Sequence, residues 1–224
     1  MRVVSEKKPI IAILGGTGKE GPGLARRLSG AGYRIIIGSR KLEKAKKTAE
    51  SINSEMGSSF VEGQLNGDAA KACNIAILTV VQSAHKPALQ GLKNALKGKI
   101  LVDATARVEF RNPYPPEPPS APRIAQDILG EEVIVVGAFQ NVPAHTLKKN
   151  IGKKLNTDVL VCADDIDAAN TVIRMAKDMG MRAFYAGGLD NSIVVEGMTA
   201  LLISINKYYG TKTASIGISG INID

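Results

Sequence analysis

The sequence is poor in the residues that build disulfides and metal centres. Among its 224 residues only Cys73 and Cys162 are cysteines, and neither belongs to a Cys-x-x-Cys pair, which argues against a disulfide framework and a zinc ribbon. The two histidines, His85 and His145, lack the spacing of metal ligands. The longest apolar runs have the length of a strand, too short to span a bilayer. We therefore expect a soluble, cytoplasmic protein without a bound metal.

Aromatic residues are also scarce, at 4% of the chain and with no tryptophan. The charge balance is basic, with 29 Lys and Arg against 21 Asp and Glu, which favours anionic partners. Proteins that bind single-stranded nucleic acid interleave aromatic and basic residues, so nucleic acid is not an expected partner. A domain contains roughly 100–200 residues, so the chain forms one domain with at most a small appendage.

Short apolar runs alternate with helical patterns along most of the chain. This alternation predicts an α/β fold, a Rossmann-type doubly wound parallel sheet. A last helix over residues 191–208 is apolar almost all round, as in helices buried in a core or against a second subunit. We expect a main domain over residues 1–188 and a C-terminal helix and tail over 189–224 that completes the substrate site or a dimer interface. Strands are expected at residues 10–14, 34–38, 58–62, 75–81, 99–104, 132–137, 158–163 and 181–186.

Two segments interrupt or decorate this pattern. Residues 112–122 hold six of the ten prolines and must form a loop, since proline cannot pair in a central strand. The loop follows the strand over 99–104, so it is either a lid on a ligand site or a stiff surface connection. Asp164, Asp165 and Asp167 cluster at the start of a predicted helix. We expect them to cap that helix rather than to bind a metal.

A glycine-rich turn carries the most informative motif. Gly16, Gly18 and Gly21 satisfy G-x-G-x-x-G, and the motif follows a predicted strand and opens a predicted helix, as a dinucleotide-binding turn requires. Gly16 permits the tight turn, Gly18 lets the backbone approach a pyrophosphate, and Gly21 allows close packing of helix on strand. The free N–H groups of the helix would then bind the phosphates. A tight turn without a ligand is the less favoured alternative.

The end of the second predicted strand indicates which dinucleotide binds. An NAD site places Asp or Glu there to bind the ribose 2′-hydroxyl. This chain has Gly38-Ser39-Arg40-Lys41 instead, with no acidic residue before Glu43. A hydroxyl and a guanidinium suit a 2′-phosphate, so we expect NADP.

The rest of the sequence offers little acid–base machinery. His85 lies near the start of a helix, where it could bind a ligand or equally be a capping or surface residue. Gln140 and Asn141 follow a strand and could pair with a nicotinamide or a substrate amide. Asp103, at the end of another strand, has a structural role in our interpretation. Hydride transfer between two redox rings needs proximity more than an acid, whereas a carbonyl or imine reductase needs a proton donor.

Six blocks of the chain together carry a resemblance to a known family. The blocks are Leu14–Gly21 (LGGTGKEG), Gly38-Ser39-Arg40, Ile77–Val80 (ILTV), Ala138–Ala144 (AFQNVPA), Asp158–Cys162 (DVLVC) and Gly188–Glu196 (GLDNSIVVE). In them the chain resembles the NADPH-dependent deazaflavin reductases, also called coenzyme F420:NADP oxidoreductases. The resemblance implies a homodimer with an NADP-binding Rossmann domain, in which Thr17, Ser39 and Arg40 hold the 2′-phosphate. It also implies hydride transfer between NADP(H) and a deazaflavin, the co-substrate, with no catalytic side chain.

The chain departs from some members of this family in two places. They have Pro-Trp-Glu-His after the Leu-Thr of the fourth strand, where this chain has Val80-Val81-Gln82-Ser83-Ala84-His85, so Trp and Glu are absent and the histidine is displaced. They also have His-Thr where this chain has Gln140-Asn141. We expect cofactor contacts from Gly16, Thr17, Gly18, Lys19, Glu20, Gly21, Ser39, Arg40, Lys41, Thr79, Val80, His85, Gln140, Asn141 and Val142.

Two alternative functions, and the role of one run of lysines, stay open at this point. One is an NADPH-dependent reductase of an imine or a carbonyl compound, with His85 or a water molecule as the proton donor. Another is a non-catalytic NADP sensor that binds a partner protein. The lysines at 148, 149, 153 and 154 could attract the anionic tail of a deazaflavin, although a solvated charge run is the simpler interpretation.

Overall fold

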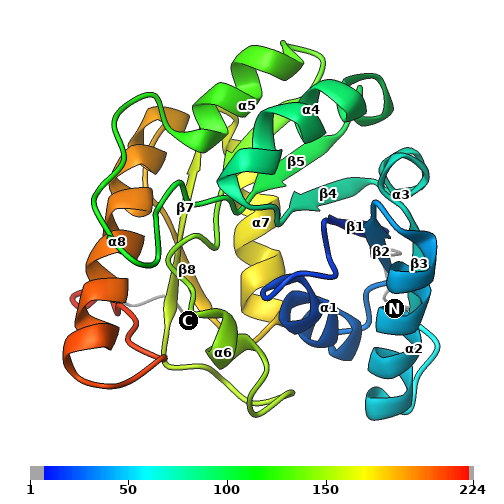
Figure 1. The fold of residues 1–224 in the computed structure, drawn as a ribbon, viewed down its shortest axis with the longest axis horizontal. Coiled ribbons are helices and arrows are strands. Elements are labelled where there is room, and N and C mark those ends of the chain that lie inside the picture. Colours follow the sequence, from blue (N-terminus) through cyan, green and yellow to red (C-terminus); the bar gives the residue numbers. More distant parts are fainter. Residues whose placement is uncertain (1–7, 222–224) are drawn as a thin grey trace, which may run out of the picture.

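The computed structural model describes residues 8–221, so the outermost residues of the two predicted ranges, 1–7 and 222–224, lie outside it. An eight-stranded sheet runs through the molecule in the order β3-β2-β1-β4-β5-β6-β7-β8, and helices cover both faces (Figure 1). The predicted doubly wound α/β fold is therefore confirmed. The strands are β1 (Ile11–Leu14), β2 (Ile35–Ser39), β3 (Val61–Leu65), β4 (Ile75–Leu78), β5 (Ile100–Asp103), β6 (Ile134–Gly137), β7 (Asp158–Ala163) and β8 (Arg182–Tyr185).

The apolar residues of each strand divide between two cores. On one face, β-branched residues such as Ile11 and Ile13 pack against α1, α2 and α7. On the other face, Ala12 and Leu14 pack against α3, α4 and α5. Strands that are apolar on both sides are typical of parallel sheets covered by helices, and β1 is buried along its whole length. These helices are α1 (Gly21–Gly30), α2 (Leu42–Met56), α3 (Asn66–Ala72), α4 (Gln82–Leu96), α5 (Ala121–Leu129) and α7 (Ile166–Asp178).

The prediction of an entirely parallel sheet is wrong at one pair of strands. β7 runs antiparallel to β6, and Val136 pairs with Ala163 while Gly137 pairs with Cys162. Only the last residues of the two strands face each other, so the first part of β7 extends beyond the carboxyl end of β6. A strand parallel to β6 would need a crossover connection, usually a helix, that returns the chain to the amino ends of the strands. The chain between β6 and β7 carries only the single helical turn α6 (Ala144–Leu147).

The C-terminal helix α8 (Ser192–Tyr208) follows a 3-10 turn, η1 (Leu189–Asn191), and packs on β7 and α5. Figure 1 shows α8 at one end of the molecule and α2 at the other. At the start of α7, the Asp165 carboxylate accepts a hydrogen bond from the backbone N–H of Ala168, which confirms capping for this residue. Asp164 instead accepts from the Leu189 N–H and pairs with Arg123. No helix within residues 8–221 has the length and apolarity that a membrane crossing needs. Among the same residues, no group of three acidic, Cys or His side chains could hold a metal ion.

A buried arginine ties α1 to the irregular segment between α6 and β7. The guanidinium of Arg27 is 3% exposed and donates hydrogen bonds only to main-chain oxygens. Burial without a carboxylate partner lowers its pKa. The five acceptors are the carbonyl oxygens of Leu147, Lys149, Asn150, Lys153 and Met179.

We expect Arg27→Leu to destabilise the protein by about 2–4 kcal/mol, because it leaves several buried carbonyl oxygens without a donor. Urea denaturation measures this change. Arg26→Leu is the matched control, since the neighbouring Arg26 pairs with the half-exposed Glu55 at the surface and such pairs contribute about 1 kcal/mol or less. Equal losses in the two variants would contradict the structural role given to Arg27.

Candidate functional site

The strand order places a crevice at the carboxyl ends of β1 and β4. From β1 the chain continues into α1 on one face of the sheet, and from β4 into α4 on the other face. This divergence of neighbouring crossovers is the topological switch point, where doubly wound sheets bind their ligands.

The glycine-rich turn fills the β1 side of this crevice with backbone. Gly15 has a φ of +71°, a conformation that side chains disfavour. A Cβ on Gly16 would lie 2.6 Å from the Ile13 carbonyl oxygen, and one on Gly21 would lie 2.4 Å from the Gly16 carbonyl oxygen. At Gly18 the nearest such contact is 3.4 Å, so the protein itself leaves space there. The geometry fits a pyrophosphate lying against Gly18.

The first turn of α1 also fits an anion. Its N-cap residue, Glu20, makes no side-chain capping hydrogen bond, and Pro22 occupies an early helical position. The N–H groups of a helix start need a partner that the helix cannot supply, and phosphate is such a partner.

The Asn66 side chain fixes the position of the turn. This residue was not predicted, because in the sequence it is only a polar residue that follows a strand. Its Oδ1 atom accepts a hydrogen bond from the Gly15 N–H at 3.1 Å. A Cβ on Gly38 would lie 2.7 Å from the same oxygen. The missing side chain at Gly38 therefore makes room for Asn66, whose bond to the Gly15 N–H connects α3 to the turn after β1.

The end of β2 presents the residues predicted for a 2′-phosphate. The buried Ser39 hydroxyl accepts a hydrogen bond from the Lys41 N–H at 3.2 Å. Arg40 and Lys41 are exposed and have no salt-bridge partner within residues 8–221. Thr17, on the neighbouring turn, is half-buried. Two cations without a partner next to a hydroxyl form a suitable anion site.

His85 is neither a capping nor a surface residue, so those alternatives are wrong. Its side chain is 3% exposed, and Nε2 lies 2.6 Å from Oδ2 of the fully buried Asp103. The other carboxylate oxygen of Asp103 accepts a hydrogen bond from the Thr105 N–H. His85 is thus a buried residue of α4, with one ring nitrogen engaged by Asp103.

Gln140 and Asn141 follow β6 in a tight turn in which Phe139 has a φ of +74°. Gln140 Nε2 donates to the Asp103 carbonyl oxygen at 3.0 Å, while its buried Oε1 atom has no hydrogen-bond partner. Asn141 uses its whole amide on β7, donating to the Asp158 carbonyl and accepting from the Leu160 N–H. In this structure Gln140 keeps a free acceptor, and Asn141 anchors the strand.

The remaining predicted residues lie around the same turn. The Thr79 hydroxyl donates to the Leu14 carbonyl oxygen at 3.2 Å, and Val80 packs directly on Gly15. Val142 is buried and closes the turn after β6. The Lys19 ammonium lies 5.3 Å from the centre of the Phe110 ring, a cation–π contact with the segment that follows β5.

That segment is fastened at both ends by Glu196 of α8, a residue that sequence reasoning missed. The fully buried carboxylate accepts hydrogen bonds from the Arg107 Nε atom at 3.0 Å and from the Ala121 N–H at 2.5 Å. Arg107 also donates to the Glu117 carbonyl oxygen. Burial raises the pKa of Glu196, and the hydrogen bonds with Arg107 and Ala121 oppose that rise. Residues 107–121, which include most of the proline-rich loop, are therefore anchored to α8 near both ends. We call this segment the strap.

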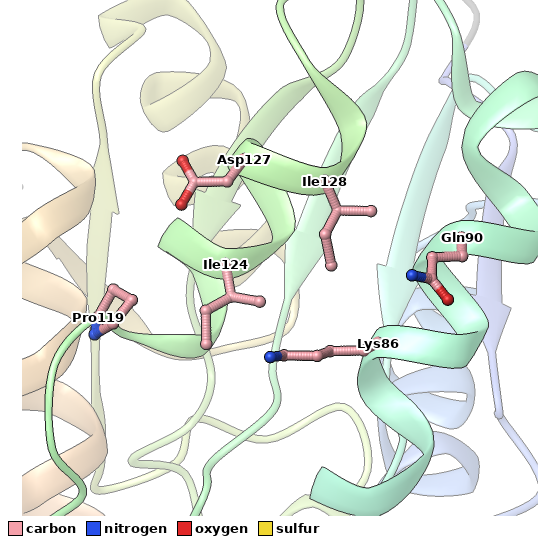
Figure 2. Close-up of a pocket in the computed structure, with 6 residues that line it drawn as sticks. All are labelled: Lys86, Gln90, Pro119, Ile124, Asp127 and Ile128. Carbon is pink, nitrogen blue, oxygen red and sulfur yellow. The ribbon is translucent and has the colours of Figure 1, made fainter.

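Two adjoining hollows open beside α4. One, of about 540 Å³, begins at the first turn of α4 and includes His85 and Arg107 in its lining. The other, of about 410 Å³, lies between α4 and α5, and Figure 2 shows the Lys86 side chain reaching across it toward Ile124. Lys86 and Ile124 line both hollows. Their sizes fall within the range of small-molecule sites, and their cations suit an anionic ligand.

Comparison with known proteins identifies the chain's relatives. A protein from Methanocaldococcus jannaschii named F420-dependent NADP reductase is 38% identical over 95% of this chain and 99% of its own length. This chain belongs to the F420-dependent NADP reductase family. A member from Methanothermobacter marburgensis is 36% identical over 94% of this chain and 98% of its own. The family model described as "NADP oxidoreductase coenzyme F420-dependent" matches residues 10–107.

A solved structure supports the fold independently. A crystal structure from Arthrobacter sp. FB24, provisionally described as an F420-dependent NADP-reductase, covers 95% of this chain and 100% of its own with a TM-score of 0.80. Its identity of 22% supports the likeness of fold alone.

Substituting two glycines of the turn should separate folding from binding. We expect Gly18→Ala to fold with nearly unchanged stability but to bind NADPH at least tenfold more weakly, since its methyl group occupies the space left for the pyrophosphate. Gly21→Ala, the matched variant, should destabilise the protein itself, because its methyl group would overlap the Gly16 carbonyl. Thermal unfolding and fluorescence titration with NADPH measure the two effects. Normal NADPH affinity in Gly18→Ala would argue against this placement of the pyrophosphate.

Proposed function

We propose that the chain transfers a hydride between NADP(H) and the deazaflavin coenzyme F420. The family membership carries this proposal, and the site supports it with a glycine-rich turn and two unpaired cations after β2. The chain matches the relatives named F420-dependent NADP reductase over nearly their whole length.

The NADP half of the site extends along the turn from β2 toward β5. We assign the pyrophosphate to Gly16, Thr17 and Gly18 with the start of α1. We assign the 2′-phosphate to Thr17, Ser39, Arg40 and Lys41, since Arg40 offers a planar set of donors that matches a phosphate.

The nicotinamide half is assigned to the ends of β4 and β6. Thr79 and Val80 form its floor, and Gln140 offers a buried acceptor, Oε1, to the carboxamide N–H. In this proposal His85 holds Asp103 in place through their hydrogen bond, while Asn141 and Val142 support the turn that presents Gln140.

The deazaflavin is assigned to the larger hollow at the first turn of α4. Arg107 and Lys86 are the cations nearest to this space, and they suit the anionic tail of that coenzyme. The lysines at 148, 149, 153 and 154 are exposed and belong to the α1 side of the sheet, opposite α4. This placement favours a solvated charge run over a binding site for the tail.

The two coenzymes supply the redox chemistry, and the chain supplies binding, orientation and exclusion of water. No residue within 8–221 is assigned as the acid or base of the hydride step. His85, the donor required by the imine or carbonyl reductase alternative, lines the larger hollow but has its Nε2 atom engaged by Asp103.

We further propose that the protein is a cytoplasmic homodimer and that α8 contributes to the interface. Val194, Leu201 and Tyr208 are spaced seven residues apart along α8, and each is more than half exposed. Such a stripe on one face of a helix is typical of a surface that pairs with a second helix. The inner face of α8 completes the substrate site through Glu196, and Thr199 donates to the Gln140 carbonyl oxygen.

Mixing the protein with NADPH and oxidised coenzyme F420 tests the activity. We expect the visible absorbance of the deazaflavin to bleach, with NADPH consumed in equal amount. A folded protein that binds NADPH but bleaches no deazaflavin would overturn the proposal. Turnover of an imine or carbonyl compound instead would support the alternative reductase.

Arg40→Ala tests the choice of dinucleotide. We expect it to weaken NADPH binding by about 1.5–3 kcal/mol, roughly 10- to 150-fold, because a charge-assisted bond to the 2′-phosphate is lost. NADH lacks this phosphate, so its affinity should change little. Titration of wild type and variant with both dinucleotides gives the comparison, and equal losses for NADPH and NADH would contradict a 2′-phosphate role.

A further inference from the structure

Glu20 is half-buried, and one of its two carboxylate oxygens is inaccessible and without a partner. Its Oε1 atom is inaccessible and makes no hydrogen bond within the described chain, and its side chain does not cap α1. Burial, with a smaller contribution from the charge of Asp103, raises the pKa of Glu20 to about 8. The carboxyl group is therefore mostly protonated at neutral pH. Buried polar atoms without partners are rare in folded proteins, and a ligand is one explanation for them.

Glu20 lies in the glycine-rich turn after β1, close enough to Asp103 for the charge of that carboxylate to oppose its ionisation. Asp103 ends β5, which lies on the β4 side of β1. Ser39, at the end of β2, lies on the other side of β1 and belongs to the adenosine half. Two of the other buried atoms without partners, Thr105 Oγ1 and Gln140 Oε1, follow β5 and β6 at the same edge. Under the proposed function, these three groups belong to the nicotinamide half of the crevice.

We propose that Glu20 distinguishes the oxidised from the reduced nicotinamide by releasing its proton when NADP⁺ binds and retaining it when NADPH binds. The oxidised ring carries a positive charge that the reduced ring lacks. A cation close to a carboxyl group favours its ionised form, typically by about 1–3 pH units. The released proton goes to solvent, and no bond to the ligand forms. The inference rests on the proposed function, because it requires NADP(H) in this crevice.

The other charged groups near Glu20 also favour its protonated form. The charge of Asp103 on β5 opposes ionisation of Glu20. His85 on α4 is hydrogen-bonded to that same carboxylate. Lys19 precedes Glu20, but its ammonium is placed over the Phe110 ring. Arg107, on the strap, is paired with the Glu196 carboxylate of α8. Glu20 therefore lacks a cation of its own, and the oxidised ring would supply one.

Calorimetric titration with NADP⁺ and NADPH between pH 6 and 9 tests the proposal. Buffers of different ionisation enthalpy report the protons released on binding. We expect NADP⁺ to release up to one proton near pH 7 and NADPH to release fewer. Below the Glu20 pKa, NADP⁺ must displace a proton in order to bind. The ratio of NADP⁺ to NADPH affinity should therefore rise by up to tenfold per pH unit and level off above about pH 8. Both dinucleotides carry the same 2′-phosphate, so its titration cancels in the ratio.

Variants assign the proton to its residue. Glu20→Gln and Glu20→Leu should both abolish the pH dependence of the ratio while still binding NADPH, which also shows that they fold. Asp167→Asn is the matched control, since Asp167 is an exposed carboxylate in the first turn of another helix, and it should retain the wild-type slope. A slope that persists in Glu20→Gln but disappears in His85→Gln would assign the proton to the His85–Asp103 pair and overturn the proposal. Normal NADPH binding without any slope in the wild type would overturn it too. Absence of NADPH binding at every pH would instead refute the proposed function.

Discussion

The close approach of α1 to β1 is the constraint on which the site depends. Gly21 lies so near the Gly16 carbonyl, and Gly16 so near the Ile13 carbonyl, that neither position has room for a side chain. The backbone of the turn therefore occupies the space between helix and strand, and the open side of the turn is at Gly18. The uncapped start of α1 lies beside that opening, so the phosphate site that we propose depends on how tightly the helix packs.

Buried charges organise the other half of the crevice. Asp103 is satisfied by His85 and the Thr105 N–H, and Glu196 by Arg107 and the Ala121 N–H. Removing one partner of such a buried pair is strongly destabilising, which fixes the positions of β5, α4 and the strap relative to one another. Glu20 differs from these carboxyl groups because one of its oxygens has no partner. Asp103 and Glu196 are thus fixed by their partners, whereas the Glu20 carboxyl group is left to respond to a ligand.

The sequence predicts those parts of the site that local geometry encodes. Gly16, Gly18 and Gly21 belong to one turn, and Ser39 and Arg40 directly follow a strand, so spacing along the chain was sufficient. Contacts between distant segments were not predictable in this way. Glu196 meets Arg107 across 89 residues, and Asn66 meets Gly15 across 51. The reversal of β7 was missed for a related reason, since a buried apolar strand reads the same in either direction.

That reversal brings the C-terminal elements of the 224-residue chain to the carboxyl ends of the parallel strands. Because β7 pairs with β6 only at its end, it continues past the carboxyl edge of the parallel strands and carries β8 and α8 with it. Asn141 fastens the turn after β6 to β7, and Thr199 of α8 fastens Gln140 from the other side. The strands that carry these C-terminal contacts therefore belong to the same sheet as β1 and β4. Such an arrangement can hold a flat ring against a nicotinamide, and proximity is the main requirement when both reactants are coenzymes.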